Sequence, residues 1–499
     1  MKTTFSSRRW EWDELQRARR EALSLWSTGA AIDLDECVEF VRALPAEKNC
    51  ALRLAQAKRQ GEVLLQPRAA LTILEHHIET LLYLQNEGGA DILPTQVDSY
   101  SRELRFDRAQ AGLEESLAAG RSRLNGLPIV IYGHQACRKI VETVDVPLCL
   151  RLVTPDARLV AEMGFAAGYT GLTSHGIDAA INFAKDYPID RAIWNWQYAD
   201  RLAAHYQENG APIFRQYRGL CDACHLPPSL TFACSILEAL VGAAQGVKVM
   251  SVDLHHCGAL VSEVAGLRVM ARLGEEYLAR LGYGDVTLVS VADHWIGQFP
   301  PDRAQAYALI NMATIAAVLG GANMIIVKSV EEGVGIPTKE ANAASCRATR
   351  ATVGSVQDQR LSLDRVALAE EERIVELEAR AILDRTLEMG DGDVAIGIVR
   401  AFEAGVLDSI LSPSRFARGE LMVVRDRQGT MRYLEAGNLP FSREVLEYNR
   451  EKIAERERAE GRTADYEMLV DDIDATAAGR LLKPREPAKL AVAGGPAAP

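Results

Sequence analysis

Short apolar runs alternate with longer helical segments between Glu62 and Lys328, and this alternation constrains the fold more than any other feature of the sequence. The runs with strand-like composition are Glu62–Arg68, Asp91–Val97, Pro128–Tyr132, Pro147–Val153, Gly168–Thr173, Ala211–Tyr217, Val247–Leu254, Val286–Val291 and Met324–Lys328. Most are continuously apolar, as expected of parallel strands covered on both faces. Eight or nine such units favour a closed (β/α)8 barrel over an open sheet. No Gly-x-Gly-x-x-Gly follows the first run, so a dinucleotide-binding fold has no support.

The segments that flank these repeats have a different composition. Residues 1–60 show apolar residues at helical spacing among dense Glu and Arg, and residues 61–360 hold the repeats. Residues 361–482 combine two charged helices with a hairpin pattern, and residues 483–499 are rich in Pro, Ala and Gly and are expected to be disordered. We therefore predict an α/β protein: a (β/α)8 TIM barrel with an N-terminal helical extension, a C-terminal α+β region and a disordered tail.

The composition disfavours several function classes. The 499 residues carry 56 Lys and Arg against 68 Asp and Glu, a formal net charge of −12, which disfavours a general nucleic-acid binder. The longest uncharged stretch, Ala304–Val327, contains Gly320 and Gly321, and we interpret it as a buried helix, a break and a strand rather than a membrane span. Nine cysteines without a secretory signal indicate reduced thiols, so we expect a cytoplasmic protein.

Three arginines stand near the ends of predicted strands, where the active site of a (β/α)8 barrel lies. Arg68 and Arg102 each follow a predicted strand, and Arg151 lies within the run Leu148–Val153. Guanidinium groups from separate strands can converge above a barrel and hold a carboxylate or phosphate through paired hydrogen bonds. The alternative is three separate surface salt bridges, and the spacing alone leaves both interpretations open.

A polar, glycine-bearing loop, Lys328–Glu340, follows the last predicted strand. Its charged groups are suited to hydrogen-bonding a ribose or another polyol. The alternative is an ordinary connecting loop with a helix that begins near Thr338.

Two further motifs are compared with known metal and cofactor patterns. Cys221, Cys224 and His225 form C-x-x-C-H, which is half of a zinc site, and the nearest candidates for the other half are His255 and His256. The run Asp253–Gly258 spells D-x-H-x-x-G, the pattern that supplies a cobalt-binding histidine in cobalamin-binding domains. Because this copy ends a barrel strand instead of lying in a separate domain, we interpret it as a polar rim and predict no metal site.

Longer stretches point to one family. They are Pro45–Asn49, Gln66–Arg68, Tyr83–Asp91, Gly120–Ser122, Leu124–Gly126, Trp196–Tyr198, Gly335–Ala344, Val424–Asp426 and Arg432–Glu435. Through them the chain resembles the epsilon subunit of glutamate mutase, also called methylaspartate mutase, from about Trp10 to about Arg480. The resemblance implies a TIM barrel that shares adenosylcobalamin with a small cobalamin-binding sigma-type subunit in a heterotetramer. It also implies a radical rearrangement of the carbon skeleton, from L-glutamate to L-threo-3-methylaspartate.

The resemblance also implies roles for individual residues. Arg68, Arg102 and Arg151 would bind the substrate carboxylates. The cofactor-binding residues would be Asn125, Phe299, Lys328, Glu332 and Ile336, of which Lys328 and Glu332 would hold the adenosyl ribose. The glycine that the family has two residues after the first arginine is Ala70 here. No catalytic residue is identified.

The departures from the family pattern cluster around the expected substrate pocket. The histidine after the third arginine is Leu152 here, and the glutamate that binds the substrate ammonium is Thr173. Two pocket tyrosines fall at Ala179 and Phe183, and a pocket phenylalanine falls at Arg218. Losing a carboxylate and gaining a guanidinium makes the pocket more positive, and an ammonium buried there without a partner is costly.

Several functional hypotheses stay open. The substrate is either a more anionic or non-amino carboxylic acid, or glutamate with Asp178 as the partner of its ammonium. A third hypothesis is an inactive barrel that binds a cobalamin-carrying partner, although the retained Lys328 and Glu332 argue against it. A fourth is a metal-dependent lyase or hydrolase that uses the Cys221 and His255 motifs.

Overall fold

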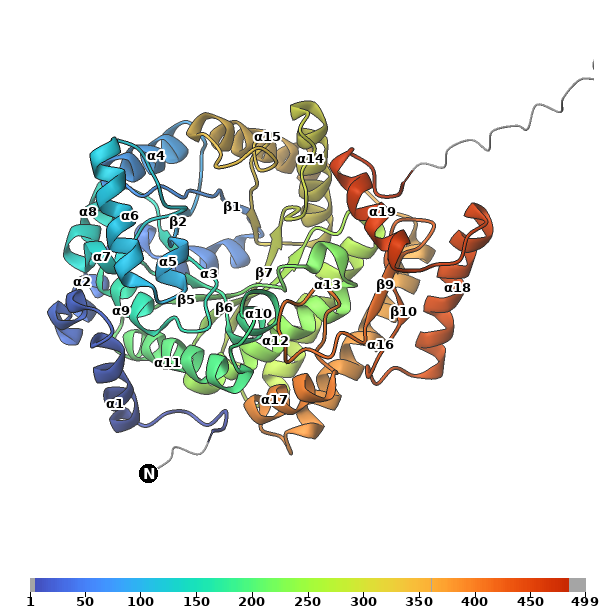
Figure 1. The fold of residues 1–499 in the computed structure, drawn as a ribbon, viewed down its shortest axis with the longest axis horizontal. Coiled ribbons are helices and arrows are strands. Elements are labelled where there is room, and N and C mark those ends of the chain that lie inside the picture. The colour runs from blue at the N-terminus through green and yellow to red at the C-terminus, as the bar shows by residue number, and fades with distance from the viewer. Residues whose placement is uncertain (1–4, 360, 484–499) are drawn as a thin grey trace, which may run out of the picture.

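Eight parallel strands form a barrel in the computed structural model, which describes residues 5–359 and 361–483 (Figure 1). The strands are β1 (Leu64–Gln66), β2 (Leu93–Gln96), β3 (Leu148–Arg151), β4 (Gly171–Thr173), β5 (Phe214–Tyr217), β6 (Val249–His255), β7 (Thr287–Asp293) and β8 (Met324–Ile326). They follow one another around the sheet, and β1 also pairs with β8, from Leu64 opposite Met324 to Gln66 opposite Ile326. The seam between β1 and β2 is bridged by the Asp91 and Ile92 amides, which donate to the Leu65 carbonyl at 3.0 and 3.3 Å.

One end of the barrel is closed by the helix that precedes β1. Helix α3 (Cys50–Gln60) places Cys50, Leu54 and Ala57 in a fully buried cluster with the inward side chains of the strands. The Cys50 amide donates to Thr170 Oγ1 at 2.9 Å, just before β4 begins. Because α3 fills the amino-terminal end, the carboxyl ends of the strands form the open mouth of the barrel.

The remaining barrel helices surround the strands (Figure 1). The longer ones are α4 (Leu74–Asn86), α6 (Phe106–Ala119), α8 (His134–Thr143), α9 (Arg158–Ala166), α11 (Ile189–Glu208), α12 (Pro228–Gln245), α13 (Leu260–Arg280), α14 (Arg303–Gly320) and α15 (Lys339–Gln357). The short ones are α5 (Ser99–Arg102), α7 (Ile129–Tyr132), α10 (Gly176–Asp178), a π-helical turn at Ala179–Phe183 and a 3-10 turn at Ala223–His225. Asp302 caps α14 by accepting from the Gln305 amide, and Gly321 ends it with a φ of +81°.

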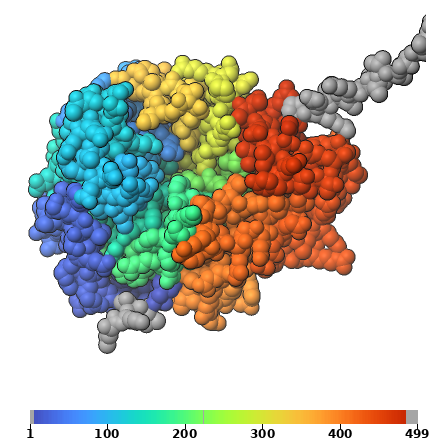
Figure 2. Space-filling view, in the orientation of Figure 1, coloured from blue at the N-terminus to red at the C-terminus, as the bar shows by residue number. Residues whose placement is uncertain are grey.

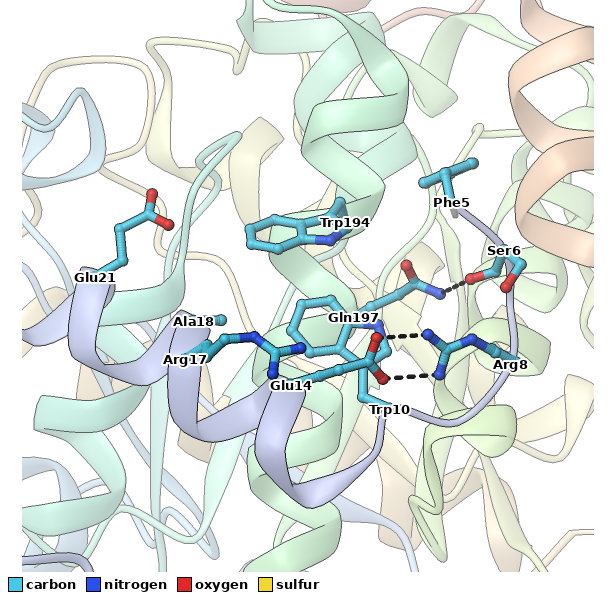
Figure 3. Close-up of a pocket in the computed structure, with 10 residues that line it drawn as sticks. All are labelled: Phe5, Ser6, Arg8, Trp10, Glu14, Arg17, Ala18, Glu21, Trp194 and Gln197. Atoms are coloured by element: carbon cyan, nitrogen blue, oxygen red, sulfur yellow. Dashed lines mark hydrogen bonds and ion pairs between the residues drawn. The ribbon is translucent and has the colours of Figure 1, made fainter. Parts of the chain in front are cut away.

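The N-terminal helices lie against the outside of the barrel. They are α1 (Trp12–Leu23), a 3-10 turn at Ser27–Ala31, α2 (Leu34–Arg42) and a 3-10 turn at Ala46–Lys48, which lead into α3. A hollow of about 190 Å³ lies between this N-terminal segment and α11. Figure 3 shows its lining residues, among which Arg8 pairs with Glu14. The Trp10 and Trp194 rings contact each other there, with centroids 4.9 Å apart.

The C-terminal region packs against one side of the barrel, where it forms the orange and red part of the surface in Figure 2. It contains α16 (Arg365–Met389), α17 (Val394–Ala404), β9 (Met422–Arg425), β10 (Met431–Glu435), α18 (Arg443–Glu460) and α19 (Tyr466–Ala477). Helix α16 lies against α12 and α13, and β9 and β10 pair antiparallel. Its buried Glu378 accepts from Ser229 Oγ on α12 at 2.8 Å and from Asn449 Nδ2 on α18 at 2.9 Å. These bonds tie the C-terminal helices to the barrel.

The fold confirms the predicted (β/α)8 barrel and corrects one of its nine predicted strands. The run Pro128–Tyr132 is not a strand, because Ile129–Tyr132 is the short helix α7. The preceding residue, Leu127, does pair in parallel with Val97, but the chain turns into a helix directly after Pro128. A five-residue apolar run has too little length for its periodicity to distinguish a strand from a buried helical turn.

The uncharged stretch Ala304–Val327 forms most of α14, the Gly320-Gly321 break and β8, as predicted. In the part of the chain that the structure describes, no helix has both the length and the apolar character needed to cross a membrane. The segment boundaries at residues 60, 360 and 482 stay a prediction. Apart from Lys483, the expected disordered tail 483–499 lies outside the described residues.

Candidate active site

Two adjoining cavities lie at the open mouth of the barrel. The inner cavity, about 300 Å³, is lined by Arg68, Gln96, Arg102, Arg151, Leu152, Val153, Thr173, Phe183, Arg218, Cys221, Ile296 and Lys328. The outer cavity, about 410 Å³, is lined by Arg68, Ala69, Ala70, Gln96, Arg102, Asn125, Glu332, Gly335, Ile336, Pro337 and Asn342. Arg68, Gln96 and Arg102 line both, so two ligands bound in these cavities would meet at these three side chains.

The structure brings the three predicted arginines together in the inner cavity. Arg68 follows β1 by two residues, Arg102 ends the short helix α5 after β2, and Arg151 is the last residue of β3. Neighbouring strands therefore deliver them to one edge of the barrel. Among the described residues, neither Arg68 nor Arg102 forms a salt bridge, which leaves both guanidinium groups available to an anion.

Arg151 is the most buried of the three arginines, at 3% exposed. Its Nη1 donates to Gln66 Oε1 at 2.7 Å and Gln216 Oε1 at 3.3 Å, and its Nη2 lies 3.8 Å from Asp293 Oδ1. Burial lowers the pKa of Arg151, while Asp293 opposes that effect. The interior amides thus fix the orientation of this guanidinium before any ligand binds.

Lys328 and Glu332 connect the two cavities. Lys328 lines the inner cavity, Glu332 lines the outer one, and Lys328 Nζ lies 3.1 Å from Glu332 Oε2. Burial, reinforced by Arg68, lowers the pKa of Lys328 to about 8. Burial would raise the pKa of Glu332, but Lys328 and Arg68 outweigh it and lower that pKa, so the carboxylate stays charged. A charged carboxylate is a strong acceptor for hydroxyl groups.

The other residues predicted to contact a cofactor are placed differently. Asn125 and Ile336 line the outer cavity, and Ile336 is 52% exposed there. Phe299 lines neither cavity, because it packs with Trp295 and Val330 in a small apolar cluster beneath the loop that carries Glu332. The assignment of these residues to substrate and cofactor stays a prediction.

The wall that departs from the family pattern follows β3 and β4. Leu152, Thr173 and Phe183 line the inner cavity, whereas Ala179 is fully buried outside its lining. Ser174, directly after β4, has a φ of +93°, a strained conformation for a residue other than glycine. The strain and the following π-helical turn shape this part of the cavity, and both features recur at functional sites.

Arg218 points into the inner cavity and is 7% exposed. Its Nη2 donates to His255 Nε2 at 3.1 Å, and its Nε lies 3.6 Å from Asp178 Oδ2. Burial lowers the pKa of His255 to about 3, so the ring is neutral and can accept this bond. Asp178 does not line the cavity, and its Oδ1 accepts from the Cys221 amide at 3.0 Å.

The cysteine and histidine motifs do not assemble into a metal centre. Cys221 lines the inner cavity, Cys224 packs in the apolar cluster with Trp295, and His256 is hydrogen-bonded to Glu263. Within residues 5–359 and 361–483, the single group of side chains close enough to share an ion is Glu36, Cys37 and His134. Arg138 already donates to both oxygens of that glutamate, at 2.6 and 2.9 Å.

A buried polar network beneath the cavity was not predicted from the sequence. Gln216 Nε2 donates to Asp253 Oδ2 at 2.6 Å, and Gln216 Oε1 accepts from Thr173 Oγ1 at 3.0 Å. Burial and the neighbouring Asp293 raise the pKa of Asp253 to about 8, so it is mostly protonated at neutral pH. The signal was present: polar residues interrupt otherwise apolar strands β5, β6 and β7 near their carboxyl ends.

The fold and the two cavities define a (β/α)8-barrel protein whose mouth holds a cation-lined cavity beside a second cavity that Glu332 lines. The family model for the methylaspartate mutase E chain (MutE) matches residues 44–484. The glutamate mutase epsilon subunit of Desulfitobacterium hafniense is 44% identical, over 96% of this chain and 99% of its own. That of Treponema denticola is 41% identical, over 94% and 96%. The chain belongs to the methylaspartate mutase E chain family.

Similarity to solved structures is much weaker. A phosphonopyruvate hydrolase complex with oxalate and Mg++ aligns with a TM-score of 0.31 and 16% identity, over 66% of this chain and 99% of that one. A TM-score this low supports no inference about this chain.

Proposed function

We propose that this chain is the catalytic subunit of an adenosylcobalamin-dependent carbon-skeleton mutase. The proposal rests on the family and on one observation: the inner and outer cavities share Arg68, Gln96 and Arg102. The relatives named above are glutamate mutase epsilon subunits, which indicates a mutase with more than one kind of subunit. We expect the partner to be a small cobalamin-binding subunit and the assembly to be a heterotetramer.

The outer cavity fits the nucleoside part of such a cofactor. Its volume of about 410 Å³ lies within the roughly 300–1,000 Å³ usual for small-molecule sites. Glu332, held in its charged form by Lys328, would accept hydrogen bonds from the ribose hydroxyls, and Asn125 and Ile336 would contact the rest of the group. When bound, adenosylcobalamin supplies a carbon-centred radical that takes a hydrogen atom from the substrate and later returns it.

The residues of this chain position and shield the reactants. Arg68, Arg102 and Arg151 would hold the substrate carboxylates, and the interior amides would fix the orientation of Arg151. Helix α3 fills the other end of the barrel, so the mouth is the open end next to the inner cavity. A ligand in the outer cavity would then cover the substrate and exclude water and side reactions.

The test is reconstitution with a small cobalamin-binding subunit and adenosylcobalamin. We expect the cofactor to promote assembly, measured by light scattering, and an added substrate to produce a paramagnetic signal. Glu332→Gln should weaken cofactor-driven assembly at least tenfold, whereas Glu340→Gln, an exposed control in the first turn of α15, should leave it unchanged. A barrel that assembles yet gives no signal with any carboxylic acid would be a binding subunit instead, and the proposal would be wrong.

A further inference from the structure

Among the described residues, the inner cavity is lined by five cationic side chains and by no carboxylate. The cations are Arg68, Arg102, Arg151, Arg218 and Lys328. An organic ammonium placed among them would be repelled by each cation and would find no acidic partner in the cavity wall. Burying a charge in that situation is strongly unfavourable.

The acids around the cavity already face its cations. Asp178 lies 3.6 Å from Arg218, Glu332 lies 3.1 Å from Lys328, and Asp293 lies 3.8 Å from Arg151. Asp98 faces Arg102 from the N-cap of the same short helix and accepts from the Ser101 amide. An ammonium that used one of these acids would have to compete with the arginine or lysine beside it.

Asp293 is the strongest candidate among these acids to bind an ammonium, because neither of its oxygens has a hydrogen-bond partner in residues 5–359 and 361–483. It lies between Arg151 and His255, whose Nε2 is 3.6 Å from Asp293 Oδ2, and it does not line the cavity. Its position therefore makes it a counter-ion for the Arg151 guanidinium, and the Asp293→Asn variant tests this role.

Arg218 adds a fourth guanidinium group with unused hydrogen-bonding capacity. One of its donors is used by His255, while its Nε has no hydrogen-bond partner in the described part of the chain although the side chain is more than nine-tenths buried. A buried donor without a partner is costly unless a ligand satisfies it. A carboxylate bound in this cavity can accept from Arg218 as well as from Arg68, Arg102 or Arg151.

We propose that the substrate is an aliphatic acid with two or more carboxylates and no free ammonium, and that Arg218 is a substrate-binding residue that sets this specificity. The inference rests on the proposed function for the reaction class, but it concerns the ligand of the inner cavity alone. Repulsion of the ammonium and satisfaction of Arg218 by a carboxylate both favour the same substrate class.

The test compares glutarate with L-glutamate, which has the same carbon chain and an added ammonium. Binding is measured by titration calorimetry on the chain assembled with its small subunit and adenosylcobalamin, and on the chain alone. We expect glutarate to bind at least ten times more tightly than L-glutamate. Arg218→Gln should weaken glutarate binding tenfold or more, while Arg105→Gln, an exposed neighbour of Arg102 outside both cavities, should not change it.

A second variant keeps the test decisive if Arg218→Gln fails to fold. Thr173→Glu places a carboxylate on the cavity wall and should reverse the binding preference. L-glutamate should bind more tightly and glutarate more weakly than to the unaltered protein. Equal or tighter binding of L-glutamate by the unaltered protein, or binding of neither acid, would overturn the inference. Loss of L-glutamate binding in Asp293→Asn would identify that acid as the ammonium partner and overturn it as well.

The two proposals fail differently. Glutarate preference without any cofactor-dependent reaction would contradict the mutase and leave the substrate class standing. A cofactor-dependent reaction of L-glutamate, with L-glutamate bound more tightly than glutarate, would support the mutase and contradict the proposed substrate class.

Discussion

The Nε of Arg218 and the Oδ2 of Asp178 lie 3.6 Å apart inside the barrel mouth, and neither atom has a hydrogen-bond partner among the described residues. They attract each other without the directional bond that would fix their geometry. Asp178 therefore supplies charge to this guanidinium without accepting a hydrogen bond from it, while His255 accepts from Nη2. The first prediction concerns the stability that this buried pair contributes.

Asp178→Asn should lower the free energy of unfolding by about 3 kcal/mol, because it leaves the buried positive charge of Arg218 with less negative charge nearby. This value is at the lower limit of the cost usual for breaking a buried ion pair. The bond from the Cys221 amide to Oδ1 survives this change. The double variant with Arg218→Met should recover most of the loss, as urea unfolding would show. Asp186→Asn removes an exposed partner of Arg415 and serves as the control, with an expected change below about 1 kcal/mol. Additive single and double effects would refute the coupling.

The second prediction is that anion binding weakens as the pH rises through about 8. Lys328, with a pKa lowered to about 8, is charged below that pH and neutral above it. The charged or titratable groups that face it are Glu332, Arg68, Asp293, His255 and His294. Asp253, whose pKa is raised to about 8, gains negative charge over the same range and acts in the same direction.

Glutarate affinity measured between pH 7 and 9 checks this prediction. Lys328→Arg keeps the positive charge and should reduce the loss of affinity, and Asp253→Asn should remove the remainder. Constant affinity of the unaltered protein across this range would contradict the assignment.

The third prediction tests the closure of the barrel by α3. Leu54 is fully buried against the inward side chains of the strands, so Leu54→Ala should cost about 2–5 kcal/mol of stability. Leu52, two residues before Leu54 on the same helix and 44% exposed, is the matched control. Leu52→Ala should stay within about 0.5 kcal/mol, measured by chemical denaturation. Equal effects of the two changes would show that α3 does not form part of the core.

The site shows what the sequence could and could not determine. Spacing suggested that Arg68, Arg102 and Arg151 could converge, but only the closed barrel decides between a shared cavity and separate salt bridges. The prediction of a strand at Pro128–Tyr132 was wrong because a run of five apolar residues fits a buried helical turn equally well. Polar residues within β5 and β6 mark Gln216 and Asp253 as unusual, but their pairing beneath the cavity depends on contacts between neighbouring strands, which local patterns do not reveal.

The fourth prediction concerns Glu378, which joins α16 to the barrel. Burial raises the pKa of Glu378 from 4.5 to about 7. Between these values the folded state keeps a proton that the unfolded chain has lost, so stability falls as the pH rises through this window and stays lower above it. Glu378→Gln can keep the bonds to Ser229 and Asn449 and removes the titration.

We therefore expect Glu378→Gln to be more stable than the unaltered protein at pH 8, by an amount on the order of 3 kcal/mol, and nearly equal to it at pH 4.5. Thermal unfolding at the two pH values measures the difference. A variant that is less stable at pH 8 would show that the carboxylate itself is needed there.

The last prediction separates the two cavities by their arginines. Arg151 lines the inner cavity alone, whereas Arg68 lines both. Lysine keeps the charge but loses the paired donors, so each Arg→Lys change should weaken ligands that need a fork of two hydrogen bonds. Arg151→Lys should raise the dissociation constant of glutarate about tenfold and leave cofactor-driven assembly unchanged. Arg68→Lys should weaken both glutarate binding and cofactor-driven assembly. It should also reduce the change in affinity that each ligand causes in the other, because such coupling requires a group that contacts both ligands. If Arg68→Lys altered glutarate binding alone, the two cavities would be independent, and the meeting of substrate and nucleoside at Arg68 would have to be abandoned.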